Sequence, residues 1–206
     1  MHQEPIRTAG QPLGTATKAL IMLHGRGASA ADILSLSRHL HVGDYALLAP
    51  QATQHTWYPQ SFLAPTAQNE PWLSAALAAV DHAVATAESS GISKDNIYFM
   101  GFSQGACLML EYVARHATRY GGVAAFTGGL IGDEVKPTTY AGDFGGTPVF
   151  IGSSDPDFHV PVERVRASTA LLTQLGAHVT EKIYPTMGHT ITQEEIELAN
   201  KLIFNS

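Results

Sequence analysis

The sequence predicts an α/β fold in which a mostly parallel β-sheet is covered by helices on both faces. Short apolar runs alternate along the chain with longer segments whose apolar residues recur at helical spacing. Such alternation is typical of parallel sheets, because each crossover helix packs on a face of the sheet. The length of 206 residues and the hydrophobic content of 45% suit a single domain spanning residues 1–206.

Strands are expected where the apolar runs are short and are bounded by polar or turn residues. In chain order these strands cover residues 18–23, 45–49, 97–100, 123–126, 149–151 and 178–184. The segment before residue 18 is irregular, and it is compatible with an edge hairpin.

Helices are expected between the strands, and several of their ends carry capping signals. They cover residues 30–40, a segment from Pro71 to just before Gly91, residues 106–115, residues 161–175 and a last helix that begins near residue 192. Pro71 suits a first helical turn, where its missing N–H is not needed. Gly176 stops the fourth helix. Thr192 and Glu195 have the spacing of a capping box for the last helix.

Residues 101–105 read G-F-S-Q-G, and their setting makes Ser103 a candidate nucleophile. A short apolar strand precedes them and a helical segment follows. A serine at such a sharp strand-to-helix turn is held in a strained conformation that exposes its hydroxyl. The two glycines remove Cβ atoms that would block the close approach of strand and helix. The alternative is a Gly/Ser turn without chemistry.

A nucleophilic serine needs a base, and we expect His189 to serve as that base. Four histidines follow the serine in the chain: His116, His159, His178 and His189. His116 falls within the next helix and is expected to face solvent, and His178 opens an edge strand. His189 lies in a Pro/Gly loop between the last strand and the last helix, where a general base can reach the serine.

The base in turn needs a carboxylate to orient it, and the loop at residues 152–161 supplies two candidates. Asp155 and Asp157 both follow a buried strand and are both placed to orient an imidazole. Spacing alone leaves both open. Asp133 and Asp143 are weaker candidates, because each lies in a Gly-rich surface loop. The aspartate that does not orient the base is expected to stabilise a turn.

Two backbone N–H groups are expected to stabilise an oxyanion. One belongs to Gln104, the residue after the candidate nucleophile, and the other to Arg26 in the Gly-rich loop after the first buried strand. Arg26 would contribute its N–H here and not its charge. His24 precedes this loop and is expected to be a structural histidine bonded to backbone.

A long segment at residues 51–72 is rich in aromatic residues, Pro, Gln and Asn and has little helical periodicity. Loops of this length in a small domain are usually functional, and exposed aromatic rings would wall an apolar pocket. The candidate substrate-binding residues are Trp57, Tyr58, Phe62, Leu63 and Trp72. The alternative for each is burial in the core. The Gly-rich loop at residues 128–146 is expected to form the opposite rim of an open groove.

The chain resembles the phospholipase/carboxylesterase family of α/β hydrolases, which includes acyl-protein thioesterases. The matching segments are L-H-G-R-G at 23–27, G-F-S-Q-G at 101–105, D-F-H-V-P at 157–161 and M-G-H at 187–189. They follow the family's order and cover nearly the whole chain. The resemblance implies a single-domain α/β-hydrolase fold with no large lid domain. It also implies acyl-protein thioesterase or lysophospholipase activity as alternatives to simple ester hydrolysis.

The resemblance favours Asp157 as the triad acid. In the family the acid lies four residues before the proline of a D-P-x-V-P segment, and counting back from Pro161 gives Asp157. This chain departs from the pattern, because Phe158 stands where a proline is usual and an additional Asp155-Pro156 lies just upstream. Asp155 therefore stays open as the alternative.

The residues together predict a serine carboxylic-ester hydrolase that acts on small-to-medium acyl esters without a cofactor. Its substrate would be a small-molecule ester or an acyl thioester, since triad chemistry does not separate the two. A metal enzyme is one alternative, with ligands drawn from His24, Asp155, Asp157, His159 and His189. A non-catalytic binding module of the same fold is the other.

Composition excludes several other classes. The chain has 12 Lys and Arg against 18 Asp and Glu, a net charge of −6, and no basic cluster that would bind nucleic acid. A single cysteine, Cys107, rules out an intrachain disulfide, and packing is its expected role. No apolar run is long enough to span a membrane and no signal pattern opens the chain, so a cytoplasmic location is expected. A homodimer remains open.

Overall fold

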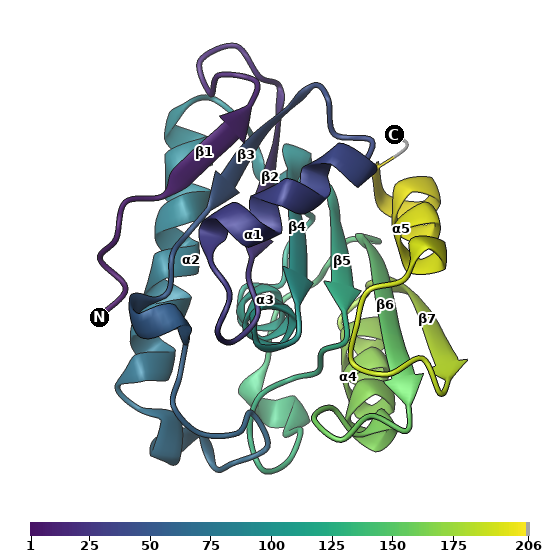
Figure 1. The fold of residues 1–206 in the computed structure, drawn as a ribbon. Coiled ribbons are helices and arrows are strands. Elements are labelled where there is room, and N and C mark those ends of the chain that lie inside the picture. The colour runs from purple at the N-terminus through teal and green to yellow at the C-terminus, as the bar shows by residue number, and fades with distance from the viewer. Residues whose placement is uncertain (205–206) are drawn as a thin grey trace.

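The computed structural model describes residues 1–204, which contain a seven-stranded sheet. The strands are β1 (Arg7–Gly10), β2 (Lys18–Leu23), β3 (Tyr45–Ala49), β4 (Ile97–Phe102), β5 (Gly122–Phe126), β6 (Pro148–Asp155) and β7 (His178–Pro185). Their order across the sheet is β1-β3-β2-β4-β5-β6-β7. Every neighbouring pair is parallel except β1 with β3 (Figure 1).

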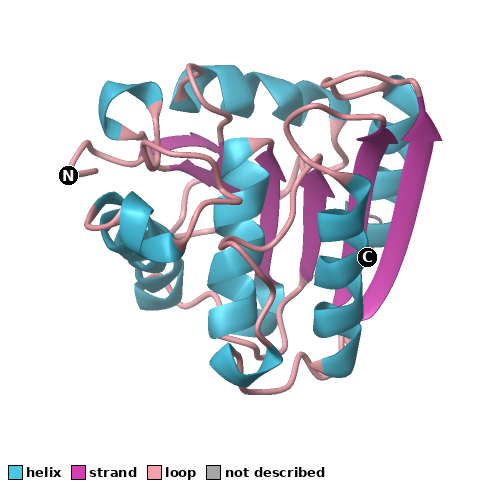
Figure 2. Ribbon diagram, turned by 90° about the horizontal axis from the view of Figure 1, so that it is seen from below, coloured by secondary structure: helices cyan, strands magenta, loops and turns pink. Residues whose placement is uncertain are grey.

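Helices cover both faces of this sheet, as the sequence predicts. The α-helices are α1 (Ala30–Ser35), α2 (Trp72–Ser89), α3 (Gln104–Arg115), α4 (Val162–Gln174) and α5 (Gln193–Ala199). Helices α2, α3 and α4 lie on one face, and α1 and α5 lie on the other (Figures 1 and 2). This is the layered α/β architecture expected from strand–helix alternation, and it agrees with the α/β-hydrolase fold that the family resemblance implies.

Strand β2 shows how the sheet divides the interior into two cores. Ala19, Ile21 and Leu23 point into the core beneath α2, α3 and α4. Leu20 and Met22 point into the core beneath α1 and α5. All five side chains are buried, because a central parallel strand has no solvent-facing side. This explains why the strand reads as a continuous apolar run and not as an alternating one.

Two helices change their type along their length. The helix expected at 30–40 is α-helical only to Ser35 and continues as a 3₁₀ turn, Leu36–His39. Such tightening is common at helix ends, and it turns Leu40 into the core beside α1. The last helix continues beyond α5 as a π-helical turn, Asn200–Phe204.

The edge hairpin expected before residue 18 does not form. Strand β1 instead pairs antiparallel with β3, in a register that sets Arg7 opposite Ala49. Both edges of β2, the next strand in the chain, are occupied by β3 and β4. Strand β1 therefore pairs with the free edge of β3. No local sequence pattern specifies this pairing.

Strand β6 is longer than its apolar run. It continues through Ser153 and Ser154 to Asp155, pairing residue for residue with β7 as far as Pro185. Both serines are fully buried. The extension carries the chain to the end of the sheet before the loop that holds Asp157 begins.

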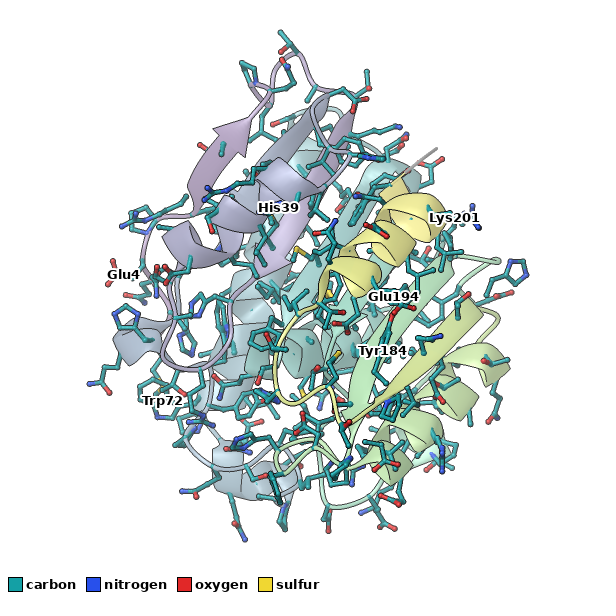
Figure 3. The ribbon with its side chains drawn as sticks, turned by 45° about the vertical axis from the view of Figure 1, so that its right-hand side comes forward. Glu4, His39, Trp72, Tyr184, Glu194 and Lys201 are labelled. Atoms are coloured by element: carbon teal, nitrogen blue, oxygen red, sulfur yellow. The ribbon has the colours of Figure 1, made fainter. Side chains whose placement is uncertain are left out.

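The predicted capping box of the last helix is present. The N–H and hydroxyl of Thr192 donate to Glu195 Oε2, at 2.8 and 3.1 Å, and the Glu195 N–H donates back to Thr192 Oγ1 at 3.3 Å. Burial raises the pKa of Glu195. The neighbouring Glu194 faces outward near Tyr184 of β7 (Figure 3), so the first turn of α5 has one buried and one exposed carboxyl.

The turn between β4 and α3 brings helix and sheet into their closest contact. A Cβ atom at Gly105 would lie 2.2 Å from the Leu23 carbonyl oxygen and 2.5 Å from that of His24. A Cβ atom at Gly101 would lie 2.8 Å from the Ala106 nitrogen. No side chain fits at these separations, so both glycines are required by the approach of α3 to the sheet.

We expect Gly105→Ala to lower the free energy of unfolding by about 3 kcal/mol, because a methyl group there must push α3 away from β2. Gly14→Ala is the matched control. No atom lies within 4 Å of a Cβ at Gly14, so its change should stay within about 0.5 kcal/mol. Urea unfolding of the two variants measures both values, and equal stability would contradict the close-approach argument.

Candidate active site

Ser103 stands at the end of β4 in a conformation that few residues adopt. Its backbone has φ 53° and ψ −119°, a region that costs of order 1–3 kcal/mol for a residue with a side chain. The turn is fixed on both sides, since the Ser103 N–H donates to the Phe126 carbonyl at 3.0 Å and its own carbonyl accepts from the Cys107 N–H at 2.9 Å. The hydroxyl is thereby lifted clear of the sheet.

A chain of two hydrogen bonds joins Ser103, His189 and Asp157. Ser103 Oγ lies 2.8 Å from His189 Nε2, and His189 Nδ1 lies 2.8 Å from Asp157 Oδ2. With the carboxyl ionised, Nδ1–H donates to Asp157 and Nε2 accepts from the serine hydroxyl. The three residues follow β4, β6 and β7, whose carboxyl ends lie along one edge of the sheet.

Asp157 is held as an anion. Its side chain is fully buried, and its second oxygen, Oδ1, accepts the N–H groups of His159 at 2.7 Å and Val160 at 2.9 Å. Burial opposes ionisation, but the hydrogen bonds from His189 and from these N–H groups outweigh it and lower the pKa of Asp157.

The structure separates the two candidate aspartates. Asp155 ends β6 with an exposed side chain, and its backbone carbonyl accepts the Thr186 N–H at 3.0 Å. Within the described residues, its carboxylate has no hydrogen bond or ion pair. Asp157 contacts the imidazole and Asp155 does not. The additional Asp155-Pro156 dipeptide is therefore accommodated at the end of β6, ahead of the loop that holds Asp157.

The loop of His189 is positioned by a residue that sequence reasoning missed. The N–H of Gly188 donates to Ser154 Oγ at 3.0 Å, and Ser154 is fully buried at the end of β6. The imidazole itself packs between the rings of Phe102, at 5.3 Å, and His159, at 4.8 Å. The available signal was the polar pair Ser153-Ser154, which continues a buried strand beside the loop of a candidate base.

Within residues 1–204, neither of the two N–H groups expected to stabilise an oxyanion has a protein acceptor. Gln104 is the first residue of α3, so its N–H has no partner within the helix. No acceptor for the Arg26 N–H occurs among residues 1–204. The loop of Arg26 is fixed by its neighbours, with the Gly27 N–H donating to the His55 carbonyl at 2.8 Å and His55 Nδ1–H to the Ala28 carbonyl at 2.8 Å.

The side chain of Gln104 has a second role that the motif did not reveal. Its Oε1 accepts the Trp57 N–H at 3.0 Å, and its Nε2–H donates to the Tyr58 carbonyl at 2.8 Å. The carboxamide is buried. It therefore ties the segment after β3 directly to the helix that begins at the serine turn.

His24 is a structural histidine, as the sequence suggests. It is fully buried, its Nδ1–H donates to the Gly25 carbonyl at 2.8 Å, and its Nε2 accepts the Ala52 N–H at 3.1 Å. Burial is the main cause that lowers its pKa. With both ring nitrogens engaged, it cannot serve the metal alternative, and residues 1–204 contain no cluster of three or more potential metal ligands.

A cavity of about 540 Å³ opens beside the serine and the imidazole. It is lined by Arg26, Tyr58, Pro59, Gln60, Ser61, Phe62, Ser103, Gln104, Cys107, His159, Val160 and His189. Cys107 is buried at its base, and burial raises the pKa of its thiol to about 12. This agrees with the expected packing role.

The predicted substrate-binding residues divide between this cavity and other places. Tyr58 and Phe62 line it, although both are buried and not exposed as expected. Trp57 does not: it is fully buried and its Nε1–H donates to the His24 carbonyl at 2.9 Å, so the expectation of an exposed ring is wrong. Leu63 borders a separate depression. Trp72 packs against His2, with ring centroids 5.5 Å apart, on the side of the molecule away from α5 (Figure 3).

The rim of the cavity opposite Tyr58 and Phe62 is not formed by the expected segment. No residue of the Gly-rich loop at 128–146 lines the cavity. That loop lies behind Phe62, whose carbonyl accepts the Gly132 N–H at 2.8 Å. The second rim is instead formed by His159 and Val160, in the loop of Asp157.

Comparison with known proteins identifies the family of the chain. The profile of a family described as phospholipase/carboxylesterase matches residues 9–205. The chain belongs to the phospholipase/carboxylesterase family. A crystal structure of a phospholipase/carboxylesterase from Dyadobacter fermentans superposes with a TM-score of 0.97 at 52% identity, covering 98% of this chain and 97% of that one.

Two curated relatives show the range of this family. A probable carboxylesterase, SOBER1-like, of Arabidopsis thaliana is 32% identical over 195 residues, covering 86% of this chain and 74% of the relative. An acyl-protein thioesterase 1 of Gibberella zeae is 35% identical over 113 residues, covering 52% of this chain and 47% of the relative. The alignment with the fungal protein thus spans about half of its length. The chain is an enzyme of the carboxylesterase type within a hydrolase family.

We expect Asp157→Asn to reduce kcat by about 10⁴-fold, because the amide favours the wrong imidazole tautomer while leaving the geometry in place. Asp155→Asn is the matched control, and it should retain most of the activity because, within the described residues, its carboxylate forms no hydrogen bond or ion pair. Steady-state hydrolysis of a 4-nitrophenyl ester by both variants measures the difference. Loss of activity in Asp155→Asn alone would show that the assignment is wrong.

Proposed function

We propose that the chain hydrolyses small-to-medium carboxylic esters through an acyl-enzyme intermediate. Ser103 is the nucleophile, His189 the general base and acid, and Asp157 the group that orients the imidazole. The single observation that carries this proposal is the unbroken hydrogen-bond chain between the three side chains. It supports the chemistry because each group faces the one it must act on.

In the first step Ser103 Oγ attacks the ester carbonyl carbon while His189 Nε2 takes the hydroxyl proton. The carbonyl oxygen becomes an oxyanion, and the N–H groups of Arg26 and Gln104 are free to stabilise it. Each such donor is worth roughly 2.7–4 kcal/mol in the transition state. The Gln104 N–H also lies at the N-terminus of α3, where the helix dipole favours negative charge.

The tetrahedral intermediate then collapses and the C–O bond to the alcohol breaks. His189 returns its proton to the departing alcohol, which leaves Ser103 acylated. A water molecule enters, gives a proton to His189 and attacks the acyl carbon. As this second intermediate breaks down, the bond to Ser103 Oγ is cleaved, His189 gives its proton to Oγ, and the carboxylic acid is released. Asp157 stays ionised throughout, in line with its lowered pKa.

The cavity supports a preference for modest acyl groups. Tyr58 and Phe62 supply aromatic surface on one side, and the volume of about 540 Å³ falls within the usual range for small-molecule sites. Thioester hydrolysis is the second candidate, favoured by the similarity to the fungal acyl-protein thioesterase. Lysophospholipase activity and a non-catalytic binding role are further alternatives. None of the steps above requires a cofactor.

The remaining parts of the proposal concern the whole protein. We propose that residues 1–206 act as one catalytic domain, because the site draws on loops that follow strands from β2 to β7 of the same sheet. A cytoplasmic location is proposed from the sequence. Among residues 1–204, no helix has both the length and the apolar character to span a bilayer. A homodimer stays open.

We expect Ser103→Ala to lose at least ~10³-fold in kcat for ester hydrolysis, since the nucleophile is removed. The fold should persist, because alanine requires no more space than serine. A fluorophosphonate probe should label the wild-type protein at Ser103 and leave Ser103→Ala unlabelled. A wild-type protein that is neither labelled nor active would favour the binding-module alternative.

We expect Phe62→Ala to impair hydrolysis of long acyl esters more than of acetate. Each methylene that loses contact with the ring forfeits up to ~0.8 kcal/mol of burial. Trp72→Ala is the control, because Trp72 lies outside the cavity, and it should lower activity evenly along the series or not at all. The kcat/KM values for 4-nitrophenyl acetate, butyrate and octanoate give the comparison. Parallel losses in both variants would make Phe62 a structural residue only.

A further inference from the structure

The guanidinium group of Arg26 is fixed at the wall of the cavity by three hydrogen bonds. Nη1 donates to Thr56 Oγ1 at 2.9 Å and to the Pro59 carbonyl at 3.2 Å, and Nη2 donates to the Gln60 carbonyl at 2.8 Å. All three acceptors are uncharged. Together they hold a long and otherwise mobile side chain in one place next to the proposed oxyanion site.

These contacts leave the charge of Arg26 uncompensated. No carboxylate of residues 1–204 forms an ion pair with it. A guanidinium has five N–H groups, and two of them, Nε–H and the second hydrogen of Nη2, have no acceptor in the described part of the chain. The side chain is also exposed to solvent, so these donors are accessible to a ligand.

The rest of the cavity wall contains no acidic residue. Of the residues that line it, only Arg26 has a fixed charge, and the others are neutral apart from the two histidines His159 and His189. Asp157 lies behind His189 with both carboxylate oxygens engaged. This positive wall occurs in a chain with a net charge of −6, so it is a local feature and not a reflection of the overall charge.

We propose that Arg26 is a specificity-determining residue that binds an anionic oxygen group, a carboxylate or a phosphate, carried by the substrate. The preferred substrates are then esters that bear a negative charge on the acyl or the alcohol part. This inference rests on the proposed function and narrows its substrate class. The bonds made and broken at Ser103 are unchanged, and the anion is only positioned.

Paired substrates test the proposal. The first pair is the 4-nitrophenyl monoester of glutaric acid and the 4-nitrophenyl ester of monomethyl glutarate, which differ in one acyl carboxylate. The second is 3-acetoxybenzoate and its methyl ester, with the charge on the leaving group. The third is 1-butyrylglycerol 3-phosphate and 1-butyrylglycerol. The measured quantity is the ratio of kcat/KM between the anionic and neutral member of each pair.

We expect the wild-type protein to prefer the anionic member of at least one pair. The preferred pair shows whether the anion is a carboxylate or a phosphate, and whether it belongs to the acyl or the alcohol part of the ester. Arg26→Gln should lower this ratio by roughly tenfold, as expected for a hydrogen bond to a charged group. Arg26→Lys should retain much of it. Arg38→Gln is the matched control and should leave the ratio unchanged, since within residues 1–204 the Arg38 guanidinium bonds only the Ser35 carbonyl at the end of α1.

Salt provides a second readout that needs no variant. The wild-type ratio should fall as ionic strength rises, because a screened guanidinium attracts an anion less strongly. A ratio of one or less in all three pairs, or a preferred ratio that does not respond to salt, would overturn the proposal. An equal loss of kcat/KM on both members of the pair in Arg26→Gln would also overturn it, because Arg26 would then only stabilise the conformation of residues 56–60. Absence of hydrolysis of every ester would instead refute the proposed function.

Discussion

The close approach of helix α3 to the end of β2 is the constraint on which the site depends. Gly105 allows the helix to reach the Leu23 and His24 carbonyls at a distance that no side chain permits. The same approach brings the loop of Arg26 next to the serine turn, since a Cβ atom at Gly25 would lie 3.6 Å from Ser103 Cβ. Ser103 adopts its positive-φ conformation in this turn.

Parallel strand order then determines which loops meet. The strands β2, β4, β6 and β7 all end at the same edge of the sheet, and each is followed by one element of the site. The segment after β3 is tied to the same centre through the Gln104 carboxamide, the Arg26 guanidinium and the buried His24 ring. A change in one of these ties would therefore alter both the proposed oxyanion donors and the cavity wall.

The sequence predicted what local patterns encode and failed where partners lie far away. Buried strands, the capping box at Thr192 and the Gly-Ser-Gly turn are local, and the structure contains them. Whether Trp57 faces solvent or core depends on a carbonyl acceptor 33 residues earlier in the chain, which no window of sequence reveals. Asp155 and Asp157 fall in one predicted loop, so spacing could not separate them until β6 was found to extend to Asp155. The pairing of β1 depends on which sheet edge is free.

Backbone strain is concentrated around the site. Within residues 1–204, five of the six non-glycine residues with positive φ follow the carboxyl ends of strands at this edge of the sheet, and they are Gln54, His55, Ser103, Thr127 and Thr186. Such conformations persist only where the surroundings over-determine them. The Thr127 N–H donates to the Gly152 carbonyl at 2.7 Å and the Thr186 N–H to the Asp155 carbonyl at 3.0 Å, so neighbouring strand ends hold each strained turn. The loops cannot take these shapes before the sheet has formed, and the alignment of the serine, imidazole and carboxylate is therefore a property of the complete fold.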